Sequence, residues 1–330
     1  MARALGNTAA WIGSALCVLG AAGTARAEDP KPAVKPAPVV ASDEEATAAV
    51  EKFKTDFKAK GLQGEDKTSQ RDFAMAQMSK VQHRLVVEQL AGVTRNPDAT
   101  LKTLAVIYLG DQRAVPGAAG AAVAAAMEKA GDDFVLSISG AQSLGSLQYL
   151  GARETIRSLL KHTNYALKKS GIAAIGEIRD MRMLGDVIAV IGLTYSADGK
   201  EGGGPEVVGE GTSWEGASAS VDTGSSGDGD QKAAEAAAKA KIAANKAAAT
   251  GAGGASSGDE GGGGLGGGGA KRTPRELIPV VLDTLRKLTG EAFPNPAAVK
   301  TWIKEHAASI AEQCKALDAA EKDQAAKAKK

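Results

Sequence analysis

The feature that most constrains this chain is a pattern that occurs three times between Leu101 and Ile191. The three copies read LKTLAVIYLGDQ, LSISGAQSLGSL and LKKSGIAAIGEI, and each contains an aliphatic residue followed by glycine. The glycines are Gly110, Gly145 and Gly176, which are 35 and then 31 residues apart. That spacing is typical of solenoids built from helix pairs, in which each pair buries its apolar side against the next. The repeat therefore predicts an all-α fold.

Each copy has the spacing of one buried helix face. A leucine lies eight residues before the aliphatic residue and a small residue lies four residues before it, so all three share one side of a helix. The small residue lets a neighbouring helix approach, and the glycine is expected to end the helix in a left-handed cap. A second helix is expected after each glycine, which makes each unit a helix, a turn and a helix. The aliphatic residues are Leu109, Leu144 and Ile175, and the apolar positions of the second helices are Ala121, Ala124, Ala125, Ile156, Leu159, Leu160, Val187, Val190 and Ile191.

These small–x–x–x–aliphatic–Gly endings and the aliphatic triplets that follow them resemble the HEAT-repeat family, including its short bacterial forms. The resemblance covers roughly residues 70–195 and 274–306 and implies a short α-solenoid of about four helix pairs. Another all-helical bundle is the alternative, because the first unit is rich in alanine. The segment KLTGEAFPNPAAVKTWIKEH also resembles the closing segment of exported bacterial HEAT-like proteins, through Phe293, Pro296 and Trp302.

The first 27 residues are typical of a secretory signal peptide. Arg3 gives a positive start, an apolar run follows, and Ala25-Arg26-Ala27 forms a small–x–small cleavage site. The chain is therefore expected to be exported to the periplasm or the extracellular space. Removal of the signal peptide leaves Cys314 as the single cysteine. It also leaves a net charge of −1, because residues 1–27 hold two arginines and no acid. A nearly neutral chain gives no electrostatic argument for nucleic acid.

Residues 28–41 contain four prolines and are expected to form a disordered tether before a helical repeat domain at 42–196. Ser42 with Glu45 forms a capping box for the first helix. The apolar spacing then predicts one helix over residues 69–95 and another over 97–109, with Asn96 as the cap of the latter.

Residues 197–272 form a low-complexity insertion, since residues 197–270 hold 22 of the 41 glycines and few large apolar residues. Such a segment is expected to be disordered, with a possible alanine-rich helix at 232–249. The segment is interpreted as an insertion into a turn of the repeat stack, because a long loop costs little more to close than a short one.

Residues 273–330 are expected to complete the stack. A helix begins after Thr273 and ends before Gly290, and its Val280, Thr284, Leu285 and Leu288 repeat the spacing of the earlier units. Asn295 is a cap for the next helix, in which Trp302 is expected to close the end of the stack. The alanine- and lysine-rich remainder is expected to fray.

The sequence contains no catalytic motif. His83, His162 and His306 have no second ligand at metal-binding spacing, so neither a metal nor a cofactor is predicted. After the signal peptide, the apolar runs fall short of the about 18 residues that a membrane span requires.

The predicted function is a non-catalytic scaffold that binds a protein or peptide partner in the cell envelope, since stacked helix pairs present an extended surface. The alternatives are an enzyme of the HEAT-like lyase type and a structural envelope protein. The candidate partner-contact residues lie at the repeat turns: Arg113, Gln148, Arg179 and Arg182.

Overall fold

The computed structural model describes residues 38–196, 206–208 and 275–329. The predicted signal peptide, most of the proline-rich tether and the alanine-rich helix at 232–249 lie outside these residues. The described part contains twelve α-helices and one two-stranded sheet. The helices are α1 (Asp43–Asp56), α2 (Gly64–Ser79), α3 (Arg84–Val93), α4 (Ala99–Gly110), α5 (Pro116–Glu128), α6 (Phe134–Leu147), α7 (Arg153–Lys161), α8 (Tyr165–Ile178), α9 (Leu184–Val190), α11 (Ile278–Thr289), α12 (Pro296–Glu305) and α13 (Ala307–Lys329).

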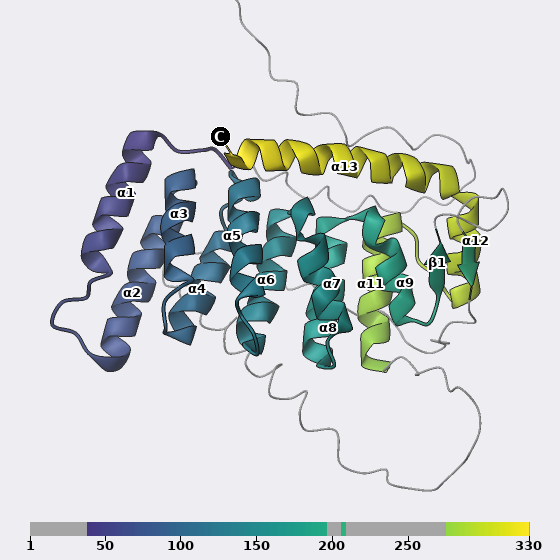
Figure 1. The fold of residues 1–330 in the computed structure, drawn as a ribbon, viewed down its shortest axis with the longest axis horizontal. Helices are drawn as coiled ribbons and strands as arrows, with labels where there is room; N and C mark the ends of the chain where they lie inside the picture. Colours follow the sequence, from purple (N-terminus) through teal and green to yellow (C-terminus); the bar gives the residue numbers. More distant parts are fainter. Residues whose placement is uncertain (1–37, 197–205, 209–274, 330) are drawn as a thin grey trace, which may run out of the picture. The chain divides into compact units, whose positions relative to one another are not determined.

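The helices pack in sequential antiparallel pairs, as the repeat spacing predicts (Figure 1). The pairs are α1 with α2, α3 with α4, α5 with α6, α7 with α8, and α9 with α11. In consequence the odd-numbered helices α1 to α9 form one row, and α2, α4, α6, α8 and α11 form the other. The three aliphatic residues of the repeat, Leu109, Leu144 and Ile175, occupy equivalent places in α4, α6 and α8 and are fully buried in one continuous core.

The sequence prediction paired each repeat helix with the wrong neighbour in the chain, the following helix in place of the preceding one. The sequence pattern joins the helix that ends near each glycine to the helix that follows it. In the structure α6 packs against the preceding α5 rather than the following α7, and α8 against the preceding α7 rather than α9, in addition to the contacts along their own row. The expected apolar side of α5 was also wrong, because Ala121 and Ala125 are exposed while Val123 and Ala126 are buried. The physical reason is that alanine occupies almost every side of α5, so apolar periodicity cannot identify its buried face.

The repeat glycines do not act as left-handed caps. Gly145 and Gly176 lie inside helices, Gly110 is the last residue of α4, and all three have negative φ. They allow close approach between neighbouring helices of one row: a Cβ on Gly110 would lie 2.9 Å from the Cα of Ser143 in α6, and one on Gly176 would lie 3.3 Å from the Cα of Thr284 in α11. Glycine is therefore required at these positions by the short distance between the backbones of two neighbouring helices.

The N-terminal part confirms the first cap and corrects the next helix. The amide of Glu45 donates to the hydroxyl of Ser42, as predicted. The helix expected over residues 69–95 is divided into α2 and α3, because the chain turns at 80–83 and His83 starts α3 by accepting a hydrogen bond from the amide of Leu85. The helix α4 is capped by Asp98 rather than Asn96.

After the inserted segment the chain returns to the same stack. The hydroxyl of Thr284 in α11 donates to the carbonyl of Ile172 in α8 at 3.0 Å, in a buried position. Lys287 pairs with Glu177 of α8 at 2.8 Å. A short antiparallel sheet that the sequence did not predict, β1 (Thr194–Ser196) with β2 (Glu206–Val208), lies beside α9 and α12.

The helix α12 lies at the end of the stack. The side chain of Asn295 accepts a hydrogen bond from the amide of Ala298, so this predicted cap is confirmed. Val299 and Ile303 supply its buried side, whereas Trp302 is partly exposed and stacks on the ring of His306 with centroids 4.5 Å apart.

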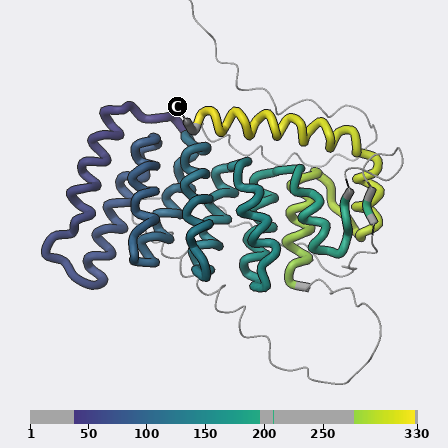
Figure 2. The backbone as a smooth tube through the Cα atoms, in the orientation of Figure 1, coloured from purple at the N-terminus to yellow at the C-terminus, as the bar shows by residue number. Residues whose placement is uncertain are grey.

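The C-terminal residues do not fray but form α13, the longest helix described. This helix runs back from α12 along one edge of the stack as far as α5 (Figures 1 and 2). It is 23 residues long. The sequence prediction was wrong here because it judged this segment by its composition, whereas packing along the stack stabilises it as a helix. The described helices include no candidate membrane span.

Candidate functional site

The turns that connect successive pairs form a polar edge on the stack. The carboxamide of Gln112, after α4, donates to the carbonyl of Ser79 at 2.6 Å, and its oxygen accepts from the amide of His83 at 3.3 Å. The carboxamide of Gln82 makes similar bonds to the main chain of residues 111 and 114. Main-chain groups of one turn are thus satisfied by side chains of the next, which keeps consecutive turns in register.

The helix α13 covers part of this turn edge with a single stripe of side chains. Its inward residues follow alternating intervals of three and four, the spacing of one helix face. The first half of the stripe is apolar and the second half is polar. The stripe consists of Ile310, Cys314, Leu317, Glu321 and Gln324.

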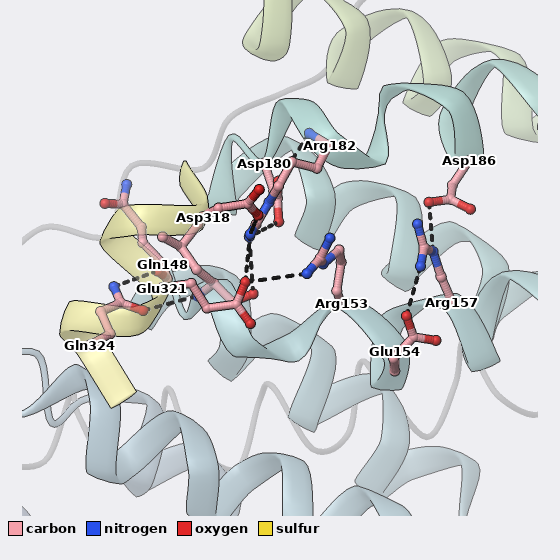
Figure 3. A network of polar contacts seen from close by, with 11 residues as sticks. Gln148, Arg153, Glu154, Arg157, Asp180, Arg182, Asp186, Asp318, Glu321 and Gln324 are labelled. Carbon is pink, nitrogen blue, oxygen red and sulfur yellow. Dashed lines mark hydrogen bonds and ion pairs between the residues drawn. The ribbon is translucent and has the colours of Figure 1, made fainter. Parts of the chain in front are cut away.

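The polar half of the stripe meets a buried arginine (Figure 3). The guanidinium of Arg182 lies 2.7 Å from Asp180 and also pairs with Asp318 and Glu321 of α13. Only 5% of the Arg182 side chain is exposed. Hydrogen bonds from Arg182 to Asp180 raise the pKa of the guanidinium above its usual value, against the opposing effect of burial. The same arginine lowers the pKa of the Asp318 carboxyl.

Three further contacts fix α13 to the turn after α6 (Figure 3). The side chain of Gln324 accepts a hydrogen bond from the amide of Leu150 at 3.2 Å and donates to the carbonyl of Gln148 at 3.4 Å. Arg153 also pairs with Glu321 at 3.4 Å. The turn edge of this stack therefore holds a helix through side chains that reach the backbone of the turns.

The four residues nominated from sequence all lie at turns, but the turns differ in access. Arg113, after α4, and Arg179, after α8, have exposed side chains. Gln148 is exposed and has φ of 49°, and its carbonyl contacts α13. Arg182 is covered by α13, and its charge is compensated within the chain. The four do not converge on one site, and their role in binding a partner stays a prediction.

A second feature, missed in the sequence, is a groove between α3 and α5 with a volume of about 390 Å³. Its walls are formed by small side chains, and Leu136 of α6 lies at its buried side. We call it the alanine groove, after Ala91, Ala122, Ala125, Ala126 and Ala130. The sequence signal was present in the alanine-rich α5, but only the distance between two non-consecutive helices determines that a hollow remains there.

Three cations surround the alanine groove: Arg95, Lys102 and Lys129. None of them forms an ion pair with a residue that the structure describes. The one acid of the lining, Asp133, accepts a hydrogen bond from the amide of Leu136 and caps α6. The groove therefore combines an apolar, methyl-lined wall with an excess of positive charge.

The histidines have local roles in the structure. His83 caps α3 and lies 2.9 Å from Asp43. The ring of His162 accepts a hydrogen bond from the amide of Asn164 at 3.0 Å, and His306 stacks on Trp302. Within the described residues no group of three or more His, Cys, Asp or Glu side chains is arranged to hold a metal ion.

Cys314 is half-buried on the inner side of α13. Burial raises the pKa of its thiol, and the nearby carboxylates of Asp180 and Asp318 raise it further. Because the thiolate is the reactive form, this environment favours an unreactive thiol near neutral pH.

No family model matches this chain, and neither the curated proteins nor the solved structures contain a significant match to it.

Proposed function

We propose that this chain is an exported, non-catalytic scaffold, built as a short HEAT-like solenoid, that binds a protein partner along its edge of turns. The observation that carries the proposal is α13 itself. A helix lies across two successive turns, after α6 and after α8, and is held there by hydrogen bonds to the backbone of the first turn and by ion pairs with Arg182 of the second. An edge that binds one helix in this way has the chemistry to bind a helix or an extended segment of another protein.

Two exposed arginines on the turn edge are the residues through which partner binding can be tested. Arg113 lies in the turn after α4 and Arg179 in the turn after α8, and both are exposed, whereas Arg182 is already paired within the chain. Rim charges of this kind guide association and discriminate between partners. We therefore place the partner contact at Arg113 and Arg179, with Gln148 between them in the chain.

The experiment is the native co-purification of the tagged full chain, with cross-linking, from the cells that produce it. A protein partner present in stoichiometric amount is expected. Its capture should fall when Arg113 and Arg179 are both changed to Glu. The matched control changes Lys161 and Lys169 to Glu. Both are exposed, but they lie near the loop that joins α7 to α8 and not at a turn between successive pairs.

Several outcomes would contradict the proposal. Undiminished capture by the double Arg→Glu variant would remove the turn edge from the contact. A co-purifying small molecule that the protein converts would favour the enzyme alternative. Export is tested separately by cell fractionation and by N-terminal sequencing, which should find that the mature chain begins at Glu28; an intact Met1 in the cytoplasm would exclude it.

A further inference from the structure

The alanine groove is a surface that α13 does not cover. It lies between α3 and α5 and is lined by residues of α3, α4, α5 and α6, whereas the contacts of α13 are with α5, the turn after α6 and the turn after α8. The contacts of α13 therefore do not account for the alanine groove.

The methyl groups define the size of what fits the groove. Alanines on both walls leave a hollow of about 390 Å³, which is in the range of small binding pockets. Such a space accepts one or two aliphatic side chains, but its walls have no aromatic ring and no buried polar side chain that would orient a compact ligand. An occupant with a short apolar part is favoured.

The charges define what must flank that apolar part. Arg95 and Lys129 follow the C-terminal ends of α3 and α5, where the helix dipole by itself favours cations. That explanation does not apply to Lys102, which lies near the N-terminal end of α4, is half-buried, and pairs with no acid in the described part of the chain. A third cation, at an unfavourable helix position and in the lining of the same hollow as the other two, favours an anionic occupant.

We propose that the alanine groove binds an acidic segment of the protein partner, with one or two aliphatic side chains between the walls and carboxylates near Arg95, Lys102 and Lys129. This inference rests on the proposed scaffold function and assigns to it a second contact, separate from the turn edge. A peptide is preferred to a compact anion because the three cations lie on three separate segments, one after α3, one in α4 and one after α5, which an extended segment can contact together.

The test uses the full chain and a pool of short synthetic peptides in which two aliphatic residues are flanked on both sides by Glu or Asp. Fluorescence anisotropy should detect binders in this pool but not in the matched pool with Gln and Asn. Binding should weaken as salt is raised, because exposed charge pairs are screened. Reversing Arg95 and Lys129 to Glu should weaken it by about tenfold or more.

A pair of alanines in α5 provides the matched control. Ala125 and Ala121 are both exposed and are one helical turn apart, but only Ala125 lines the groove. Ala125→Leu should therefore block peptide binding, whereas Ala121→Leu should leave it within about twofold of the parent. Circular dichroism of both variants checks that α5 is intact.

The inference is overturned if no acidic peptide binds, or if Ala125→Leu binds as well as Ala121→Leu. It is also overturned if dodecanoate binds in the groove while the peptides do not, since that result would assign the site to an anionic amphiphile. A partner that is captured through Arg113 and Arg179 but is insensitive to Ala125→Leu would remove this inference alone and leave the scaffold proposal standing.

Discussion

At the residue scale, the same residue type has opposite roles at neighbouring positions. Arg179 and Arg182 are three residues apart in one turn, and both appear in sequence as exposed cations. In the structure Arg179 is exposed and has φ of 57°, whereas Arg182 is enclosed by three carboxylates and by α13. Two of those carboxylates belong to residues more than 130 positions later in the chain, so local sequence carries no sign of the difference.

The pair supplies a stability prediction. Arg182→Met should lower the free energy of unfolding by about 3 kcal/mol, because it leaves the buried Asp180 without its counter-charge. Arg179→Met should change it by less than about 0.5 kcal/mol, since that side chain is exposed. Urea unfolding of the two variants measures both values. Equal effects would show that α13 does not enclose Arg182.

At the element scale, the repeat glycines determine how closely consecutive pairs pack. The spacing of glycine and aliphatic residue identifies the helices correctly. The reason for the glycine is different from the one that sequence suggests, since no cap forms and a neighbouring backbone fills the space instead. Caps and close contacts both favour glycine, and a single sequence does not separate them.

Two glycine-to-alanine changes test the close approach of α4 and α6. Gly110→Ala should destabilise the fold by about 1–3 kcal/mol, because its Cβ would lie 2.9 Å from the Cα of Ser143. Gly92→Ala should stabilise it by about 0.5–1 kcal/mol, since Gly92 is inside α3 with nothing within 4 Å of its added Cβ. Thermal unfolding reports both shifts. Stabilisation by both changes would refute the close approach of α4 and α6.

At the scale of the whole molecule, α8, α9 and α11 join parts of the chain that are far apart in sequence. The helix α11 packs on α8 and α9 although residues 209–274 lie between β2 and α11. The stack is therefore completed by a segment that follows the insertion, and the insertion does not need to bridge two separate bodies of the described structure.

Replacement of residues 209–274 by a Gly-Ser linker of about 12 residues should leave the stack intact and raise the free energy of unfolding by about 1–2 kcal/mol, the difference in loop-closure entropy. Urea unfolding should remain a single transition, because α11 belongs to the same core as α8. Two transitions, or loss of the folded state, would contradict this organisation.

The sequence alone determined that the chain is helical, that its helices stack in sequential pairs, and that Leu109, Leu144 and Ile175 occupy equivalent buried positions, because these properties depend on the spacing of apolar residues within about one helix length. It also determined the caps at Ser42 and Asn295, since a cap is formed by contacts within three residues.

Only the tertiary structure decided which helices form pairs, which alanines of α5 are buried, and where α13 lies. It also decided that Arg182 is enclosed and that the three cations around the alanine groove form no ion pair with a described residue. The physical reason is distance along the chain: these properties depend on contacts between helices that are far apart in sequence, and an alanine- and lysine-rich helix has the same composition whether it packs or remains in solvent.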